Sequence, residues 1–138
     1  MSVLGIDFGN DNAVIAVARR GGIDMAVNQA SNRATPVVIG FGNNGEGRML
    51  GEKGKTSVMS NIKGTVLSIK RYIGRSFGEA DLKEEIMQTA GIVAGEREVA
   101  FEVNFEGEKQ QFEATRICGM MFQVRHDTPI CILQRINL

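Results

Sequence analysis

Apolar runs separated by short polar breaks organise the first 28 residues. Residues 3–6 and 13–17 are apolar, and "DFGNDN" (7–12) interrupts them. The continuous apolar run over 13–18 is typical of a strand covered on both faces. Ile23, Met25 and Val27 then repeat at a period of two, after a turn through Gly21 and Gly22. We therefore predict three consecutive strands in an antiparallel meander, with the first two forming a buried pair.

The next segment predicts a hairpin and a helix. After Pro36, residues 37–41 read as a strand, and Asn44-Gly45 is a turn signal that returns the chain through 48–51. Apolar residues then fall at helical spacing over 62–73: Ile62, Val66, Ile69 and Ile73. Ser60 or Asn61 is expected to cap this helix and Gly74 to close it.

The second half predicts further helices around another hairpin. Residues 78–91 have one apolar stripe and acidic residues in the first turn, which favours an exposed helix. Residues 99–105 alternate strictly, Gly107 turns the chain, and 109–112 complete a hairpin. A helix over 115–125 carries Ile117, Cys118, Met121 and Val124 on one face, and residues 130–133 read as a short buried strand. The order of elements indicates a mixed α/β fold.

Composition narrows the class of protein. The 138 residues fit one domain, with 43% hydrophobic and 23% charged residues. The formal net charge is zero, so there is no electrostatic reason to expect nucleic acid or a membrane surface as partner. No apolar stretch approaches a membrane span, and "MSVLGID" lacks the features of a secretory signal. Two cysteines and one histidine make a disulfide framework or a His/Cys metal site improbable and favour a reducing compartment.

Two phosphate-binding motifs compete in this sequence. "GEKGKTS" (51–57) ends like a Walker A loop, but only two residues separate Gly51 from Gly54, where that loop needs four before its Gly-Lys pair. We read it as a solvated loop or a short helical turn. The break "DFGNDN" is the better candidate, because Gly9 and its Asn/Asp neighbours tolerate the left-handed backbone that gathers N–H groups into a phosphate nest.

The residues alone leave both readings of this break open. Asp7 would repel bare phosphate, and it makes sense at such a site only if a divalent cation such as Mg²⁺ lies between. A polar hairpin end is about equally compatible with the pattern. Lys70 and Arg71 are better explained as basic residues in the last turn of a helix, where they complement its dipole, and nothing in the pattern alone makes Lys70 catalytic. We read His126 as a surface residue and Cys118 as a core residue.

Several stretches together resemble the N-terminal ATPase domain of the heat-shock protein 70 superfamily. They appear in order as "GIDFGNDN", "GGIDMAVNQASNRATPVVIGF", "RMLGE", "GTVLSIKRYIGRSF" and "EVNFEGEKQQFEATRICGMM", covering residues 2 to about 122. Asn10, Asp11 and Asn12 stand where typical members have two threonines and a tyrosine. This substitution and "VIAVARRGGID" make the chain most similar to the heat-shock protein 110-like branch.

The resemblance implies a partial actin-like ATPase (ribonuclease H-like) fold, with a mixed sheet and a small second subdomain. It implies that Gly9, Asn10, Asp11 and Asn12 cradle the phosphates of ATP or ADP and that Asp7 holds Mg²⁺ through water. It also implies that Lys70 positions the attacking water and stabilises γ-phosphate charge, as the catalytic residue. The absent threonine hydroxyls argue against rapid hydrolysis.

The resemblance also sets expectations for the whole protein. Residues 1–122 would be a truncated N-terminal lobe and 123–138 a divergent tail. The second phosphate loop and the adenosine pocket would lie outside this chain, so the chain alone is not expected to be catalytic. The implied function is that of an ATP-binding co-chaperone and nucleotide exchange factor. Its partners would be heat-shock protein 70 chaperones and unfolded polypeptide clients, in the cytoplasm or also the nucleus. An ATP-hydrolysing chaperone and an inactive fragment are the alternatives.

The tail carries one further expectation. In the family, the strand after the third helix lies beside the first strand. Right-handed connection would make such a pairing parallel, so we predict that residues 130–133 pair with residues 3–8.

Overall fold

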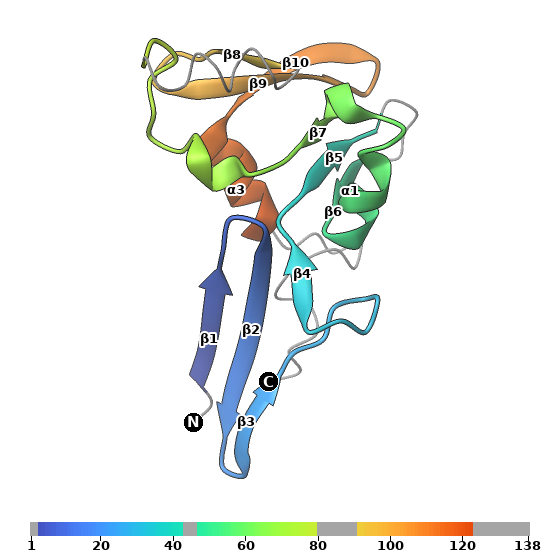
Figure 1. Cartoon of the computed structure of the whole chain (residues 1–138), viewed down its shortest axis with the longest axis vertical. Coiled ribbons are helices and arrows are strands. Elements are labelled where there is room, and N and C mark those ends of the chain that lie inside the picture. Colours follow the sequence, from blue (N-terminus) through green and yellow to red (C-terminus); the bar gives the residue numbers. More distant parts are fainter. Residues whose placement is uncertain (1–2, 43–46, 80–90, 123–138) are drawn as a thin grey trace.

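The described part of the chain contains three antiparallel sheets and the helices α1 and α3, with α3 at the centre. The computed structural model of the 138-residue chain describes residues 3–42, 47–79 and 91–122. Figure 1 shows the sheet of β1–β4 below the helix α3, the sheet of β8–β10 above it, and the sheet of β5–β7 beside it with the short helix α1. The mixed α/β class predicted from the sequence is confirmed.

The N-terminal sheet contains the predicted meander. It comprises β1 (Val3–Phe8), β2 (Asn12–Arg19), β3 (Gly22–Met25) and β4 (Ala34–Pro36), in the order β1-β2-β3 with β4 also on β2. β1 pairs with β2 from Val3↔Ala18 to Phe8↔Ala13 without interruption. β3 and β4 share the other edge of β2, with β3 near the end of that strand and β4 near its start.

The expectation that the first two strands form a buried pair is wrong. β2 buries Ala13, Ile15 and Val17 and leaves the intervening residues half-buried, so one face is covered far better than the other. Every residue from Val3 to Asp7 on β1 is exposed. Of the buried β2 residues, Ala13, near the Asn12 end, belongs to the main hydrophobic core, and Figure 1 shows β1 and β2 running together away from α3.

The strand predicted over 37–41 is shorter in the structure and belongs to a second sheet. Its strands are β5 (Ile39–Phe41), β6 (Arg48–Leu50) and β7 (Thr65–Val66), in the order β6-β5-β7, and α1 (Glu52–Ser57) follows β6. Val37 and Val38 are buried but belong to neither sheet, because the chain crosses here from the β2 edge to β5. The return strand is confirmed, and the Asn44-Gly45 turn lies outside the described residues.

The predicted helix over 62–73 is also wrong. The segment forms two 3₁₀ turns, η1 (Ile62–Gly64) and η2 (Ile69–Arg71), with β7 between them. Asn61 does cap the first turn, since its side chain accepts a hydrogen bond from the Gly64 N–H. Thr65 and Val66 then pair with β5, and Ser68 adopts a left-handed φ of 50° that interrupts any helix. Tertiary pairing with β5 thus overrides the helical spacing.

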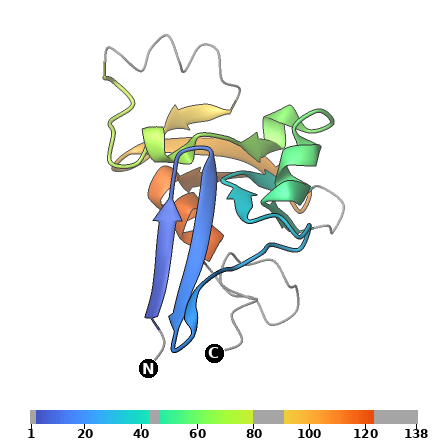
Figure 2. The same ribbon diagram turned by 60° about the horizontal axis from the view of Figure 1, so that its bottom comes forward.

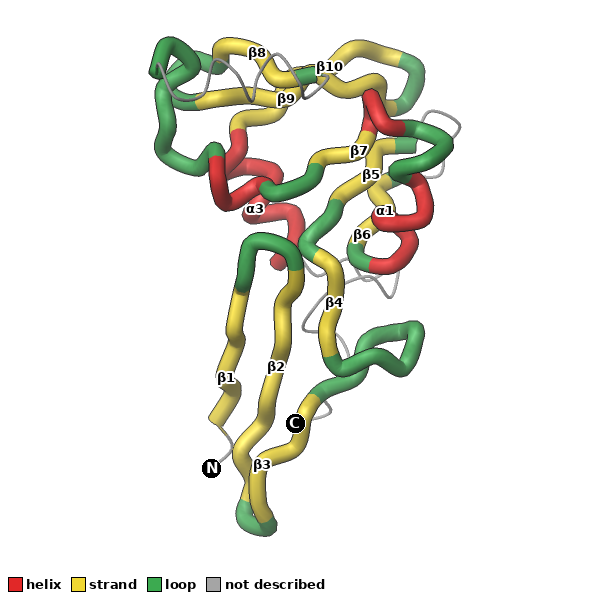
Figure 3. Tube along the Cα trace, in the orientation of Figure 1, coloured by secondary structure: helices red, strands yellow, loops and turns green. Residues whose placement is uncertain are grey.

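The β9–β10 hairpin and α3 match their predictions, whereas β8, the third strand of their sheet, was not predicted. β8 (Ile92–Ala94), β9 (Val99–Phe105) and β10 (Glu108–Glu113) form the order β10-β9-β8, and α3 runs over Ala114–Phe122. Figure 2 shows α3 behind the β1–β2 hairpin, and Figure 3 shows how little of the trace is helical. Most of the predicted helix over 78–91 lies outside the described residues. The same is true of Val124, His126 and the predicted strand over 130–133, which lie entirely outside them.

The hydrophobic core joins the sheet of β5–β7 to the sheet of β8–β10, with α3 packed between them. Ile117 and Met121 of α3 are fully buried with Ile39 and Phe41 of β5. The Phe41 and Phe112 rings stack at 5.3 Å, and Tyr72 meets Phe101 edge-on at 5.4 Å. Burying this much aromatic and aliphatic surface is the main stabilising term of the fold. It also fixes η2 and α3 next to the tip of the β1–β2 hairpin.

Candidate phosphate-binding turn

A tight turn joins β1 to β2. The Gly9 N–H donates to the Asn12 carbonyl at 2.9 Å, which leaves Asn10 and Asp11 as the two central residues. A Cβ at Gly9 would lie 2.6 Å from the Asn12 oxygen, so only glycine fits there. The Asp11 carbonyl accepts the Val37 N–H at 2.8 Å, which ties the turn to the chain between β4 and β5.

The turn is not the left-handed nest that the sequence predicted. Among the described residues, positive φ occurs at glycines and at Ser31, Ser68 and Glu106, but not at residues 9–12. The bond from Gly9 to Asn12 closes the turn without it. Even so, the backbone N–H groups of Asn10 and Asp11 donate to no group in the described part of the chain. Two adjacent donors are therefore available at the tip.

Lys70 lies at this turn although 62 residues separate it from Phe8. The Lys70 ammonium donates to the Phe8 carbonyl, and its Nζ lies 5.8 Å from the centre of the Phe8 ring. The Phe8 ring in turn packs on Phe122 of α3, with centroids 4.8 Å apart. The ammonium has three donors and uses one on Phe8, so η2 delivers a positive charge with spare donors to the hairpin tip.

The Asp7 side chain lies on the opposite face of the N-terminal sheet from the Phe8 ring. Successive strand residues point to opposite faces, so the Asp7 side chain projects away from the Phe8 ring and lies beside Val14, its partner on β2. The carboxylate is exposed. No cluster of three or more His, Cys, Asp or Glu residues that could hold a metal ion exists among residues 3–42, 47–79 and 91–122. The metal-binding role of Asp7 stays a prediction.

Asn10 carries an unpaired buried acceptor. Its Nδ2 donates to Asp11 Oδ1 at 3.1 Å, while its Oδ1 is buried and has no hydrogen-bond partner. Buried polar atoms are nearly always paired, so such an orphan marks a place where a donor is missing. A phosphate oxygen is itself an acceptor and would not satisfy it, whereas a water bound to Mg²⁺ would. The free N–H groups of Asn10 and Asp11 and the Lys70 ammonium suit phosphate, and Asn10 Oδ1 suits a water bound to Mg²⁺, so these residues fit a magnesium nucleotide. Asp7 projects from the opposite face of β1, and its part in the site stays a prediction.

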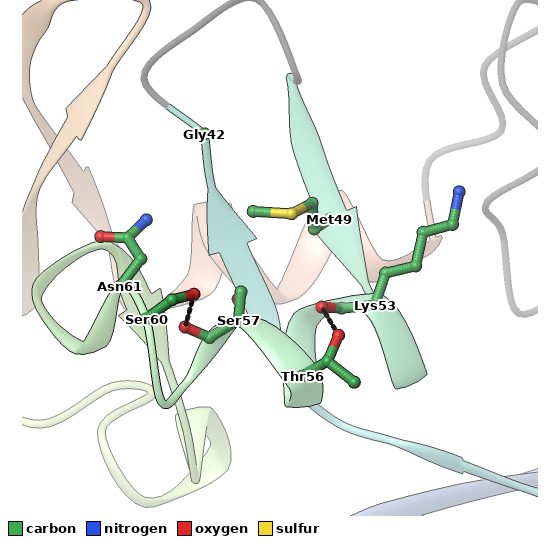
Figure 4. Close-up of a pocket in the computed structure, with 7 residues that line it drawn as sticks. All are labelled: Gly42, Met49, Lys53, Thr56, Ser57, Ser60 and Asn61. Carbon is green, nitrogen blue, oxygen red and sulfur yellow. Dashed lines mark hydrogen bonds between the residues drawn. The ribbon is translucent and has the colours of Figure 1, made fainter.

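A pocket in the structure lies at the motif "GEKGKTS", apart from the β1–β2 turn. An open pocket of about 490 Å³ is lined by Gly42, Met49, Lys53, Thr56, Ser57, Ser60 and Asn61 (Figure 4). The hydroxyls there serve the local backbone, since Thr56 donates to the Lys53 carbonyl and Ser57 to that of Gly54. The motif forms α1, so the expected short helical turn is confirmed. None of the residues of the β1–β2 turn lines this pocket.

Comparison with known proteins shows to which family this chain belongs. The model of the family described as "Hsp70 protein" matches residues 3–131. The chain belongs to the Hsp70 protein family. It is 44% identical to a heat shock protein homolog of Saccharomyces cerevisiae over 126 residues, which is 90% of this chain and 18% of that protein. It is 44% identical to Heat shock protein hsp88 of Neurospora crassa over 130 residues, 93% of this chain and 18% of that protein.

A plant relative extends the same comparison. Heat shock 70 kDa protein 14 of Arabidopsis thaliana is 41% identical over 123 residues, 88% of this chain and 15% of that protein. The resemblance to the heat-shock protein 110-like branch of the Hsp70 family is confirmed by the Saccharomyces cerevisiae homolog and hsp88. The chain spans less than a fifth of the length of these relatives. Among the described residues, no helix is long and apolar enough to cross a membrane.

The structure adds one residue to the candidate site, Phe8, and a further feature to a residue that the sequence already indicated, Asn10. Phe8 supplies the carbonyl that holds Lys70, and Asn10 was expected to cradle phosphate but also offers a buried acceptor. No sequence signal marks Phe8, because its role depends on η2 and α3 meeting the hairpin. Cys118 is half-buried, close to its expected core placement. Burial raises the pKa of its thiol, and the nearby charge of Lys70 only partly opposes this, so the thiol stays protonated at neutral pH.

Proposed function

We propose that this chain supplies the first phosphate-binding segment of a heat-shock protein 110-like chaperone. The observation that carries the proposal is the attachment of Lys70 to the Phe8 carbonyl, which brings η2 to the β1–β2 turn. Membership of the Hsp70 family supports nucleotide binding with Mg²⁺ as the chemistry of this site. The magnesium ion, when bound, neutralises phosphate charge and orients its oxygens.

The residues of this chain bind and orient the phosphates. The free N–H groups of Asn10 and Asp11 and the spare donors of Lys70 point to a site for anionic oxygens. Asn10 Oδ1, and Asp7 as the resemblance implies, would accept hydrogen bonds from water bound to Mg²⁺. No side-chain hydroxyl lies between residues 9 and 12, so the turn binds phosphate through amides and does not orient it as threonines would. We therefore expect the nucleotide to be held with slow turnover.

The function of the complete protein follows from this assignment. We propose that it acts as a nucleotide exchange factor for heat-shock protein 70 chaperones and holds unfolded polypeptides, in the cytoplasm with the nucleus as a second location. The similarity to the Saccharomyces cerevisiae homolog and hsp88 supports this proposal. An ATP-hydrolysing chaperone and an inactive segment are the alternatives that the experiment must separate.

A chimera tests the proposal directly. Residues 3–122 replace the matching segment of the Saccharomyces cerevisiae homolog, and two rates are measured: release of labelled ADP from a heat-shock protein 70, and ATP hydrolysis by the chimera alone. We expect exchange close to that of the unmodified yeast protein and little hydrolysis. A second chimera carrying Lys70→Ala should bind ATP at least tenfold more weakly, whereas Lys53→Ala, in the other pocket, should not change binding.

Each other outcome has a definite meaning. A folded chimera without exchange activity or ATP binding would show that the segment is inactive. Hydrolysis well above that of the unmodified yeast protein would favour the ATP-hydrolysing chaperone. Equal ATP binding by the Lys70→Ala chimera and its parent would remove Lys70 from the site.

A further inference from the structure

A buried carboxylate away from the β1–β2 turn joins η2 to α3. Glu98, directly before β9, is only 8% exposed. Its Oε2 accepts the Gly74 N–H at 2.6 Å, and its Oε1 accepts the Thr115 N–H at 2.7 Å. Gly74 lies just after η2, the turn that carries Lys70, and Thr115 lies in the first turn of α3. One side chain therefore connects two elements that are far apart in sequence.

Both of these elements meet the end of β1. Lys70 of η2 donates to the Phe8 carbonyl, and Phe122 of α3 packs on the Phe8 ring, with centroids 4.8 Å apart. Figure 1 shows α3 leading from the sheet of β8–β10 to the tip of the β1–β2 hairpin, and η2 contacts α3. The placement of η2 relative to α3 therefore decides where the Lys70 ammonium lies at the tip.

The backbone around Glu98 strengthens the connection. The Val99 N–H donates to the Arg75 carbonyl at 2.8 Å, so the start of β9 holds the segment after η2 by main chain and by side chain. Gly74 has a φ of 71°, a conformation that glycine adopts readily. On the other side, Glu98 accepts an N–H that cannot bond within the first turn of α3, where negative charge is also favourable.

The carboxylate is charged at neutral pH. Burial raises the pKa of Glu98, but the Thr115 side chain, the N–H groups of Gly74 and Thr115, and the charge of Arg97 together bring the pKa below 4.5. A charged acceptor makes the stronger hydrogen bonds. Both N–H donors therefore have a strong acceptor under physiological conditions.

Apolar packing holds η2 in a different way. Ile69 and Tyr72 are buried, and the Tyr72 ring meets Phe101 edge-on at 5.4 Å. Apolar burial is non-directional and keeps η2 against the core. Hydrogen bonds are directional, so the two bonds to Glu98 set the position of η2 along α3.

We propose that Glu98 is a positioning residue for the nucleotide phosphates, because it holds the turn after η2 against α3 and thereby fixes the Lys70 ammonium at the end of β1. This rests on the proposed function of the β1–β2 turn and adds a residue that itself contacts no ligand. Without the carboxylate, the Gly74 and Thr115 N–H groups lose their common acceptor and η2 shifts along α3. Lys70 then leaves the Phe8 carbonyl more often and contributes less to phosphate binding.

The amide resonance of Gly9 measures the position of Lys70 without any nucleotide. This N–H belongs to the same peptide group as the Phe8 carbonyl, so its chemical shift responds to loss of the bond from Lys70. In the isotopically labelled chain, Glu98→Gln should move the Gly9 resonance toward its position in Lys70→Met. Glu102→Gln, the same change further along β9, is the matched control and should leave the resonance in place.

A second variant covers a failure of Glu98→Gln to fold. Glu98→Asp keeps the charge but is one methylene shorter, so it cannot reach both N–H groups, and it should move the Gly9 resonance in the same direction. An unmoved Gly9 resonance in the folded Glu98 variant would show that the proposal is wrong. A Gly9 resonance that does not respond to Lys70→Met also overturns it, because Lys70 would then have no fixed place at the Phe8 carbonyl.

Nucleotide affinity separates positioning from a general loss of stability. In the chimera with the yeast homolog, Glu98→Gln should weaken ATP binding roughly threefold or more. Added to Lys70→Ala, the same change should weaken binding no further, because Glu98 acts only through Lys70. Two losses that multiply would mean that Glu98 affects the site by another route, and the proposal would fail. Unchanged ATP binding by the Lys70→Ala chimera would instead contradict the proposed function, while the Gly9 resonance would still decide whether Glu98 positions Lys70.

Discussion

At the scale of single residues, Lys70 and Glu98 act over long sequence separations. Lys70 joins η2 to the end of β1 through the Phe8 carbonyl. The Glu98 carboxylate accepts the N–H of Gly74 at 2.6 Å and that of Thr115 at 2.7 Å, so it joins the turn after η2 to the first turn of α3. Both contacts hold the segments that surround the hairpin tip.

Replacing Lys70 should affect ligand binding far more than folding. Lys70 is exposed, so Lys70→Ala leaves no cavity, and the lost hydrogen bond and ring contact should lower the free energy of unfolding by less than about 1 kcal/mol. Urea denaturation measures this, with Lys70→Met as the control that keeps the apolar stem. A loss of more than about 2 kcal/mol would show that Lys70 is chiefly structural.

Glu98 should make stability depend on pH in the acid range. Burial alone raises its pKa, but the Thr115 side chain, the N–H groups of Gly74 and Thr115, and the charge of Arg97 together bring the pKa below the ordinary value of 4.5. Because the folded pKa is the lower one, the stabilisation is complete above about pH 4.5 and is lost as pH falls through the folded pKa.

The variant Glu98→Gln tests this assignment. At pH 7 it should lower the free energy of unfolding by roughly 2 kcal/mol, because an amide cannot accept both bonds as a carboxylate does. Thermal melts from pH 7 to pH 3 should show the gap between variant and wild type closing in acid. Glu102→Gln is the control, since the half-buried Glu102 pairs with the exposed Lys109 and its replacement should change little. A gap that stays constant with pH would contradict the role of the Glu98 charge.

At the scale of elements, the segment over 62–73 shows how local spacing misleads. Its four apolar residues have helical spacing, yet Ile62 and Ile69 lie in two separate 3₁₀ turns, Val66 lies in a strand, and Ile73 follows the second turn. The segment reaches from β5 to α3, and that span is what places Lys70 at the hairpin. Two of the four apolar residues are buried as a result, and the other two are exposed.

Two identical substitutions distinguish this arrangement from a helix. Ile69 is 2% exposed and Ile62 is 63% exposed, although a helix would bury both on one stripe. Ile69→Ala should cost about 2–5 kcal/mol of unfolding free energy, and Ile62→Ala less than about 0.5 kcal/mol. Chemical denaturation of both variants gives the comparison. Comparable large losses would mean that the segment packs as the helix first expected.

At the scale of the whole molecule, the proposed site consists of the β1–β2 turn and Lys70. The donors of the β1–β2 turn and of Lys70 approach a phosphate from one direction, whereas good small-molecule sites bury most of the ligand. The chain also spans less than a fifth of its relatives. Its function in nucleotide exchange is therefore proposed for the longer protein of this type.

The chain alone should bind ATP very weakly. Half a phosphate clamp leaves most of the nucleotide in water, so isothermal calorimetry with Mg²⁺ should detect no micromolar affinity, which would need about −8 kcal/mol. ADP and inorganic phosphate serve as comparisons. Saturation at micromolar ATP would show that residues of this chain enclose the nucleotide more completely than the turn and Lys70 alone allow.

Strong local signals in the sequence were enough to predict several elements and the family. Strict alternation predicted the β9–β10 hairpin, short turns predicted the meander of β1–β3, and the motifs from "GIDFGNDN" to "KRYIGRSF" indicated the Hsp70 family. They also pointed to the hairpin tip and Lys70 as one site, through the resemblance and not through any spacing. The predicted pairing of residues 130–133 with 3–8 lies outside the described residues and stays a prediction.

Tertiary contacts were needed to establish where the hairpin and Lys70 meet and which apolar residues are buried. Thr65 and Val66 pair with β5 because that contact outweighs a weak helical preference. Val3, Leu4 and Ile6 look like core residues in sequence but are exposed, although Val17 and Ile15, the β2 partners of Leu4 and Ile6, are buried. The Asn10 turn closes through the bond from Gly9 to Asn12 and not through left-handed residues. Such outcomes depend on contacts between distant segments, which no local pattern encodes.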